Sequence, residues 1–142
     1  MRLSGGKFEI LPYNWIMNKE AINDRPLYLN APKMALEFLV ENLGFVLHGC
    51  AVSKNAHSVE VCDSYGNLHE VFLNTRKNEN NTHNFKLIIN TTDCLQDFYL
   101  LELKGVSIIR KPHYVPDGLA FEISDYWNNR YIFLEKRDYT DL

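Results

Sequence analysis

The chain has 142 residues, of which 46% are apolar, so it is the size of one ordinary domain and can bury a core without cross-links. Its 15 basic and 18 acidic residues are spread along the whole length and sum to a net charge of −3. Because no basic patch is evident, neither nucleic acid nor a membrane surface is expected as a partner.

The cysteines and the N-terminal residues indicate the cellular compartment. The three cysteines, Cys50, Cys62 and Cys94, lie far apart and form no C-x-x-C pair. Met1 to Leu11 lacks the apolar run of a signal peptide, and no stretch approaches the roughly 20 apolar residues that span a bilayer. We therefore expect a cytoplasmic protein whose cysteines pack inertly, because no neighbouring cation would activate a thiolate.

The first clear elements in the chain are a strand and a helix. Leu27 to Pro32 reads as a short strand that leads into a helix from Lys33 to Leu43. Pro32 suits the first helical turn, and Gly44 suits the left-handed residue that ends a helix. Apolar residues at helical spacing give this helix a face to bury.

Beyond Gly44 apolar and polar residues alternate, which is typical of strands. The predicted strands are Phe45 to Val52, His57 to Cys62 and Leu68 to Leu73. The polar run from Asn74 to Asn84 reads as a linker. This half of the chain is therefore predicted to run strand, helix, strand, strand, strand.

The same order recurs about 60 positions later. A strand at Leu87 to Asn90 precedes a helix from Asp93 to Lys104 that stops at Gly105, and Asp93 with Gln96 makes an N-terminal capping pair. The strands that follow are Val106 to Arg110, Leu119 to Ile123 and Tyr131 to Leu134. We interpret the chain as one βαβββ module written twice. The alternative is an ordinary α+β domain whose elements coincide by chance.

This interpretation predicts an α+β fold. Its parts are an N-terminal extension at 1–23, a first module at 24–74, a linker at 75–84, a second module at 85–136 and a C-terminal tail at 137–142. Within the extension, Phe8 to Met17 is expected to add a strand or to cover a sheet edge. The two modules are expected to superpose about a pseudo-twofold axis.

Three segments carry a resemblance to a known family. Asp63 to Phe72 reads Asp-Ser-Tyr-Gly-Asn-Leu-His-Glu-Val-Phe and resembles the Asp-Pro-x-Gly-Asn-x-x-Glu-Leu turn and strand that end a module of the vicinal oxygen chelate superfamily. Gly118 to Asn129 is similar to the final hairpin of that family, with Asn128 where glycine is usual. Leu43-Gly44-Phe45 is similar to its helix-ending Leu-Gly-Phe. The resemblance covers about residues 24 to 136.

The resemblance implies a cupped, eight-stranded mixed sheet with helices on its convex side and a small-molecule cavity inside. The superfamily includes glyoxalase, bleomycin-resistance proteins and extradiol dioxygenases. Members that do chemistry hold a divalent metal on the first and last strands of each module, where it acts as a Lewis acid on substrate oxygens. Zinc, iron, manganese and nickel suit such ligands.

The implied metal ligands are only partly present. The interval from Asp63 to Glu70 matches the family's spacing for its carboxylate ligand, but the same interval from Asp125 ends at Ile132, which cannot bind a metal. The first-strand ligands would fall near Asp24 or Arg25 and near Phe85 or Lys86; none is histidine, and His83 lies too early. We therefore expect no firmly bound cofactor, with a divalent metal as the open alternative.

The alternation of side chains along each strand indicates which residues share a face with the candidate ligand-binding residues. Glu70 shares a face with Leu68 and Phe72 and, by the family pattern, faces the cavity as a proton acceptor, although an exposed glutamate is the plain alternative. The matching face of the second module carries Arg130, Ile132 and Leu134. Arg130 would meet an anionic substrate or lie exposed beside its turn.

Aromatic residues and histidines complete the candidates. Tyr13, Trp15 and Trp127 would line an aromatic ligand pocket, or else make core or dimer contacts. The histidines His48, His57 and His69 lie on three strands without ligand-like pairing, so they are interpreted as surface or partly buried residues rather than as a metal site.

Three functions follow from the resemblance. The leading hypothesis is a homodimeric protein that binds a small organic molecule in the sheet cavity and sequesters it, as bleomycin-resistance relatives do. The first alternative is a metal-dependent lyase, isomerase or dioxygenase that uses Glu70 as ligand or base. The second is a non-catalytic interaction module whose cavity is filled by its own side chains, such as Phe72, Ile132 and Leu134.

Overall fold

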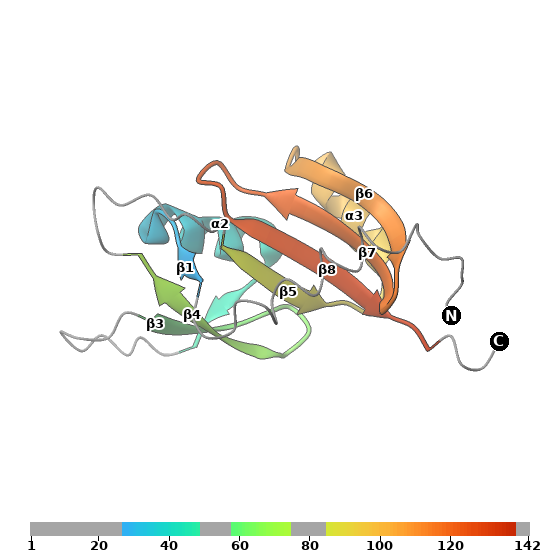
Figure 1. Ribbon diagram of the computed structural model, residues 1–142. Coiled ribbons are helices and arrows are strands. Elements are labelled where there is room, and N and C mark those ends of the chain that lie inside the picture. Colours follow the sequence, from blue (N-terminus) through green and yellow to red (C-terminus); the bar gives the residue numbers. More distant parts are fainter. Residues whose placement is uncertain (1–26, 49–57, 75–84, 139–142) are drawn as a thin grey trace.

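The computed structural model describes residues 27–48, 58–74 and 85–138 (Figure 1). The predictions for the extension at 1–23, the linker at 75–84 and the strand portion beyond His48 lie outside the described residues.

The described residues form eight strands and two helices in the predicted order. The first half contains β1 (Tyr28–Leu29), α2 (Pro32–Leu43), β2 (Val46–Leu47), β3 (Ser58–Cys62) and β4 (Leu68–Leu73); the second contains β5 (Lys86–Asn90), α3 (Cys94–Leu103), β6 (Ser107–Val115), β7 (Gly118–Ser124) and β8 (Arg130–Lys136). Each half is a βαβββ unit, so the predicted α+β class is confirmed.

The strands are divided between two mixed sheets with the same topology. Sheet 1 has the order β1-β4-β3-β2 and sheet 2 the order β5-β8-β7-β6. In each sheet the first strand of the module runs parallel to the last strand, and the other neighbours are antiparallel. Among the described residues no strand of one sheet pairs with a strand of the other. Closure of both sheets into one cup therefore stays a prediction.

The C-terminal end of α2 and the N-terminal start of α3 lie where the sequence predicts them. Gly44 has φ +73° and its N–H donates to the Leu39 carbonyl, which closes α2. Asp93 caps α3 by accepting a hydrogen bond from the Gln96 N–H (3.1 Å). The side chain of Asp93 thus satisfies one of the N–H groups that a helix start leaves open.

The sixth strand is longer than predicted. The alternation from Val106 stops at Arg110, yet pairing with β7 continues to Val115, with register irregularities on both sides of Arg110. Pro112 interrupts the pattern in the sequence, but β6 is the edge of sheet 2, where a strand tolerates a missing N–H donor. Backbone pairing with β7 therefore overrides the local pattern.

One large core lies between the helices and the sheets. Figure 1 shows α3 behind β6 and β7. The Phe98 ring of α3 packs edge-on against Phe121 (5.6 Å between centroids), and the Phe38 ring of α2 stacks on Tyr131 (5.6 Å). The helix of the first module therefore packs on the sheet of the second.

Sheet 2 also buries its other face, on the side away from α3. This second face of sheet 2 holds a smaller apolar cluster of Val115, Ala120, Ile132 and Leu134, with Ile88 packed against it. Every residue of β7 is buried as a result. A strand buried on both sides is unusual for an antiparallel sheet open to solvent, so this face differs from the exposed face of sheet 1.

Candidate functional site

The turn that ends the first module is organised by Asp63. Its Oδ1 accepts hydrogen bonds from the N–H groups of Tyr65 (2.9 Å) and Asn67 (3.0 Å), and its Oδ2 lies 2.7 Å from His69 Nε2. Gly66 supplies the positive φ of +88° that the turn needs. The Asp-x-x-Gly-Asn spacing thus brings the N–H groups of the turn within hydrogen-bond distance of one buried carboxylate.

Asp125 repeats this arrangement in the second module. Its Oδ1 accepts from the N–H groups of Trp127 (2.8 Å) and Asn129 (3.1 Å), and its Oδ2 accepts from the Tyr131 hydroxyl (2.9 Å). Asn128 takes the positive φ (+69°) where the first turn has glycine. Burial, followed by the charge of Asp125, raises the pKa of Tyr131 above its usual range, so the hydroxyl keeps its proton.

Both turns also fasten the modules to each other. The Asn129 side chain accepts from the Asn30 N–H (2.8 Å) and donates to the Asn30 carbonyl (3.0 Å), directly before α2. The Tyr65 hydroxyl lies 2.6 Å from Asp97 Oδ2 on α3. Burial and the Asp97 hydrogen bond raise the pKa of Tyr65 to about 12. Each module's turn therefore contacts the region around the other module's helix.

Cys94 is a packing residue at the start of α3. It is fully buried, and its N–H donates to Glu135 Oε1 (2.9 Å). Burial, followed by the nearby charge of Glu135, raises the pKa of its thiol to about 12, so the thiolate is not formed near neutrality. Cys62 is partly exposed and also free, while Cys50 lies outside the described residues.

The structure places Glu70, Leu68 and Phe72 on the exposed face of sheet 1. Glu70 Oε2 accepts a hydrogen bond from Ser58 Oγ (3.1 Å), and Glu60 stands opposite Glu70 on β3. Leu68 is 53% exposed. The predicted carboxylate therefore lies in an open setting on the sheet.

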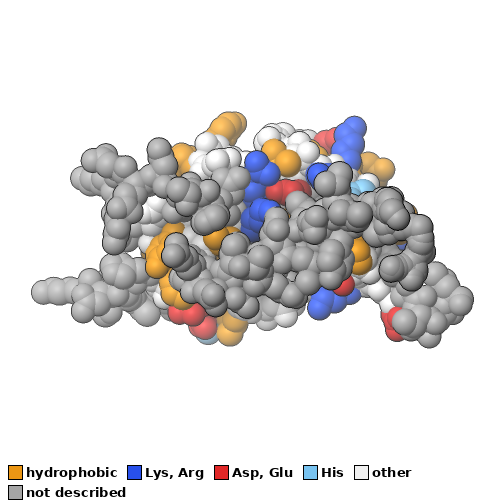
Figure 2. All heavy atoms as spheres, in the orientation of Figure 1, with side chains coloured by type: hydrophobic (Ala, Val, Ile, Leu, Met, Phe, Trp, Pro, Cys, Tyr) orange, Lys and Arg blue, Asp and Glu red, His pale blue; other side chains and the backbone are white. Residues whose placement is uncertain are grey.

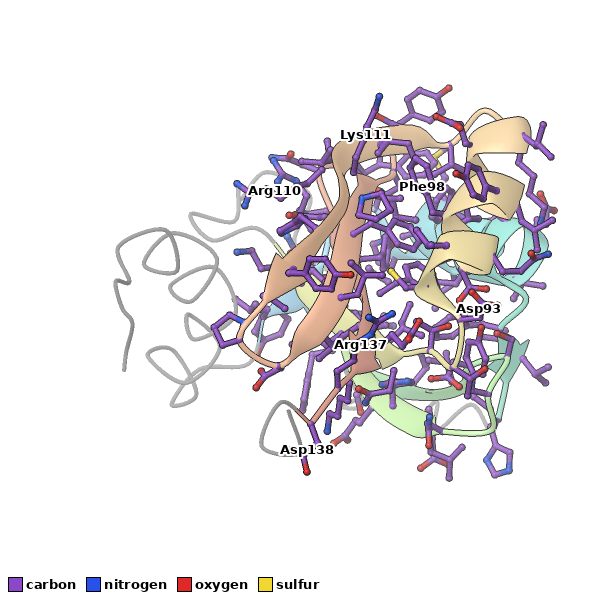
Figure 3. All side chains as sticks on the ribbon, turned by 90° about the vertical axis from the view of Figure 1, so that its right-hand side faces the viewer. Asp93, Phe98, Arg110, Lys111, Arg137 and Asp138 are labelled. Carbon is purple, nitrogen blue, oxygen red and sulfur yellow. The ribbon has the colours of Figure 1, made fainter. Side chains whose placement is uncertain are left out.

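The second face of sheet 2 contains a buried acid. Glu122 is 2% exposed, and its Oε2 accepts from Arg130 Nη1 (3.1 Å). Arg110 stands opposite Glu122 on β6, and Lys86 stands opposite Arg130 on β5. Figure 3 shows the Arg110 side chain on the side of sheet 2 away from α3, whereas Phe98 points from α3 toward the sheet. A charge this deeply buried needs such partners.

A hollow of about 640 Å³ opens at the other end of this face. Its walls come from β5, the turn between β6 and β7, and the end of β8; they include Ile88, Asn90, Asp117, Leu134, Lys136 and Asp138. Figure 3 shows Arg137 and Asp138 at this end of the sheet. Ile88 and Leu134 belong both to the hollow and to the apolar cluster, so the two are continuous.

Comparisons with known proteins agree with this geometry. No protein-family model matches the chain, and no curated protein does. TnmS3, an antibiotic binding protein from Streptomyces sp. CB03234, aligns with a TM-score of 0.63 at 20% identity, covering 80% of this chain and 93% of its own. A member of the glyoxalase/bleomycin resistance protein/dioxygenase superfamily from Sphaerobacter thermophilus DSM 20745 aligns with a TM-score of 0.58 at 21% identity, covering 79% of this chain and 94% of its own. The chain has the vicinal oxygen chelate fold.

An enzyme shares the fold as well. Lactoylglutathione lyase from Agrobacterium tumefaciens aligns with a TM-score of 0.56 at 15% identity, covering 78% of this chain and 90% of its own. At such identities the likeness establishes the vicinal oxygen chelate fold alone. Within the described ranges, neither helix is long and apolar enough to cross a membrane.

The second module lacks the ligands that a metal in this fold would need. On parallel neighbours β5 and β8, Ile132 stands opposite Ile88. The first-strand residue next to Ile132 is therefore Ile88, two positions beyond Lys86. Two hydrocarbon side chains offer no donor atoms, so the described residues do not fit a metal at this position.

The remaining candidates also fall short of a metal site. His48 Nδ1 lies 3.0 Å from Glu60 on the exposed surface, and His69 contacts Asp63. Among the residues that the structure describes, no three His, Cys, Asp or Glu side chains gather in a way that could hold an ion. Asp24, Arg25, His57 and His83 lie outside the described residues, as do Tyr13 and Trp15.

Sequence reasoning placed Arg130, Ile132 and Leu134 on one face but missed Glu122. Ile132 and Leu134 belong to the buried cluster, while Trp127 is half-buried in the turn between β7 and β8 and does not line the hollow. The signal for Glu122 was present, because it is the one charge inside the apolar run from Leu119 to Ile123. A charged residue in such an apolar strand predicts either that its side of the strand faces solvent or that it has a buried partner of opposite charge.

Proposed function

We propose that the protein binds a small organic molecule in the hollow beside the second face of sheet 2. The observation that carries the proposal is the continuity of the hollow with the apolar cluster through Ile88 and Leu134. The hollow, at about 640 Å³, lies within the usual range of small-molecule sites, and such sites combine apolar walls with a few polar groups. Here Asn90, Asp117 and Lys136 are among the polar groups on the walls of the hollow.

Binding without metal chemistry is the function that the residues support best. The name of TnmS3 describes an antibiotic binding protein, which supports sequestration as one use of this fold. The metal-dependent lyase, isomerase or dioxygenase would depend on Glu70, which lies on sheet 1 with Ser58 and Glu60 around it. Glu70 lies on sheet 1 and not in the walls of the hollow, so its role as an anchor for the ligand stays a prediction.

Filling the hollow tests the site. Asn90 is exposed on its wall, so Asn90→Trp should occupy the space without disturbing the core. We expect this change to weaken the binding of a neutral probe, biphenyl carboxamide, about tenfold or more, which corresponds to about 1.4 kcal/mol. Binding is measured by amide chemical shifts in a titration, where the amides of Ile88 and Leu134 should move.

Gln96→Trp is the matched control, because Gln96 is exposed on α3. It should bind the probe like the parent protein. Equal binding by Asn90→Trp, or shifts confined to residues elsewhere, would show that the hollow is not the site. Glu70→Gln in the same titration tests the anchor role, which requires weaker binding at unchanged stability.

We further propose that the protein is a homodimer. The exposed face of sheet 1 carries large apolar side chains, among them Tyr28, Val46 and Leu68, and the two-residue strand β1 is an edge of this sheet in the described part of the chain. Exposed apolar surface beside open edges favours association. Light scattering should give twice the chain mass of 16.6 kDa, and Leu68→Lys should shift it toward one chain mass.

Leu103→Lys serves as the control for this change. Leu103 is 84% exposed at the end of α3, on another surface, so its replacement should leave the dimer intact. A parent protein that stays at 16.6 kDa throughout the micromolar range would rule out the dimer.

A further inference from the structure

The second face of sheet 2 is buried more completely than its own side chains explain. Leu134 is 3% exposed and Ile132 is 1% exposed. The neighbours of Leu134 on this face are Ala120 on β7, which has a short side chain, and Asn90 on β5, which is itself exposed. Side chains stand roughly perpendicular to a sheet, so neither neighbour reaches over the Leu134 methyl groups. A further layer must cover them.

Sheet 1 shows the matching positions in a more open setting. Phe72 on β4 matches Leu134 on β8, because each lies the same number of residues after the aspartate of its turn. Glu70 matches Ile132 in the same way. Glu70 is exposed and Phe72 is partly exposed, whereas their counterparts are buried. Because the two sheets have the same topology, the difference comes from what lies over sheet 2.

The described elements do not supply that layer. The helix α3 packs on β6, β7 and β8, and Figures 1 and 3 show it on one side of sheet 2, with no other described helix or strand over the opposite side. Figure 2 views that opposite side, where basic and acidic side chains are visible near the middle of the molecule. Charged groups thus reach the surface there, while the apolar cluster does not. Its cover has to be sought outside residues 27–48, 58–74 and 85–138.

The N-terminal part of the chain has the composition that such a cover needs. Seven of the ten residues from Phe8 to Met17 are apolar or aromatic, and one, Glu9, is charged. Residues 75–84 contain no apolar side chain, residues 49–57 have mainly small or polar ones, and residues 139–142 contain two. An apolar face is stabilised most by a segment that buries apolar area of its own.

The attachment point of this segment lies near the face. Nine residues join Met17 to Leu27, and an extended chain of this length spans up to about 30 Å. Asn30, three residues beyond Leu27, is hydrogen bonded to Asn129 directly before β8. Leu134 lies about 17 Å further along that strand. The segment is therefore long enough to reach the face, and its covalent tether favours its own chain over a second copy.

We propose that the segment from Phe8 to Met17 lies over the second face of sheet 2 of the same chain. Its apolar and aromatic side chains pack on the cluster formed by Val115, Ala120, Ile132 and Leu134. Leu134 also borders the hollow, so the segment is part of the surroundings of the proposed ligand site. The contact is intramolecular and requires no ligand, so it is independent of the proposed binding function.

Nuclear Overhauser contacts in the full chain locate the segment. With isoleucine and leucine methyl groups labelled, we expect cross-peaks from the rings of Tyr13 and Trp15 to the methyl groups of Ile132 and Leu134. A mixed sample of two differently labelled chains should show these cross-peaks within one chain. Cross-peaks to the same methyl groups from residues 139–142 instead, or cross-peaks between chains alone, would overturn the proposal, because another segment or a second copy would then be the cover.

Two charges in the segment should release it from the face. In the variant Ile10→Asp/Ile16→Asp, docking would bury carboxylates against an apolar cluster, which is unfavourable. We expect a neutral gadolinium chelate in solution to relax the methyl groups of Ile132 and Leu134 severalfold faster in this variant than in the parent protein. The methyl groups of Ile123, which belongs to the large core, should relax as they do in the parent.

Val40→Asp/Leu103→Asp is the matched control, because both residues are exposed on the helices. It adds the same charge and should leave the methyl groups of the second face protected. Equal exposure in the two variants, or no change in the segment variant, would contradict the proposal. If Ile123 also becomes accessible, the segment variant has unfolded, and Trp15→Ala takes its place. That variant should expose the second face while Ile123 stays protected, and unchanged relaxation would overturn the proposal.

Discussion

Gly118→Ala is expected to lower the free energy of unfolding by about 3 kcal/mol. Gly118 begins β7 with φ +153°, a conformation that residues with a side chain rarely adopt. A Cβ atom at this position would lie 2.0 Å from the Glu135 carbonyl oxygen and 2.9 Å from the Arg137 nitrogen. Both contacts are with backbone, so β8 itself would have to move. Urea denaturation followed by circular dichroism measures the change.

Gly105→Ala separates the backbone angle from the clash. Gly105 has φ +79° with no atom within 4 Å of an added Cβ, so alanine there meets strain but no neighbour. We expect it to cost about 1 kcal/mol. If the two variants lose the same stability, the close approach of β7 and β8 at Gly118 is not what makes this glycine necessary.

Asp125→Ala is expected to cost about 3 to 4 kcal/mol. The carboxylate accepts four hydrogen bonds, two from backbone N–H groups and one each from the Asn129 side chain and the Tyr131 hydroxyl. Asn129 and Tyr131 are fully buried, so the loss leaves their polar atoms without water or partner. Because Asn129 also holds Asn30, the contact between the modules should weaken too. Thermal unfolding measured by calorimetry gives the loss.

Two further variants apportion this effect. Tyr131→Phe removes one of the four hydrogen bonds and should cost about 1 kcal/mol. Asp93→Ala removes an exposed helix cap, with a similar expected cost of about 1 kcal/mol. A loss for Asp125→Ala no larger than that for Asp93→Ala would mean that the turn does not depend on its buried carboxylate.

Local rules were sufficient to predict the elements of this protein. Helix ends depend on short-range chemistry, so Pro32, Gly44 and Asp93 located α2 and α3 closely. The β4 strand was predicted at its observed limits, because the turn on its N-terminal side and the polar run that follows it define both ends. The β6 strand was predicted too short, because its second half is held by pairing with β7 rather than by its own pattern.

The candidate site was only partly predictable. Period-two alternation is a property of the chain, so the shared face of Arg130, Ile132 and Leu134 followed directly from the sequence. The pairing of Glu122 with Arg130 depends on the register between β7 and β8, which a single sequence does not reveal. The register of β5 against β8 likewise placed Ile88, rather than Phe85 or Lys86, beside Ile132.

The sequence by itself determined the repeated βαβββ order and the two aspartate turns, because helix caps, strand alternation and tight turns are set by residues close together in the chain. Only the tertiary structure decided that the second face of sheet 2 is buried, that Glu122 lies there among basic residues, and that a hollow opens beside Leu134. These features arise where strands distant in sequence meet, and their register and packing are set by the whole core.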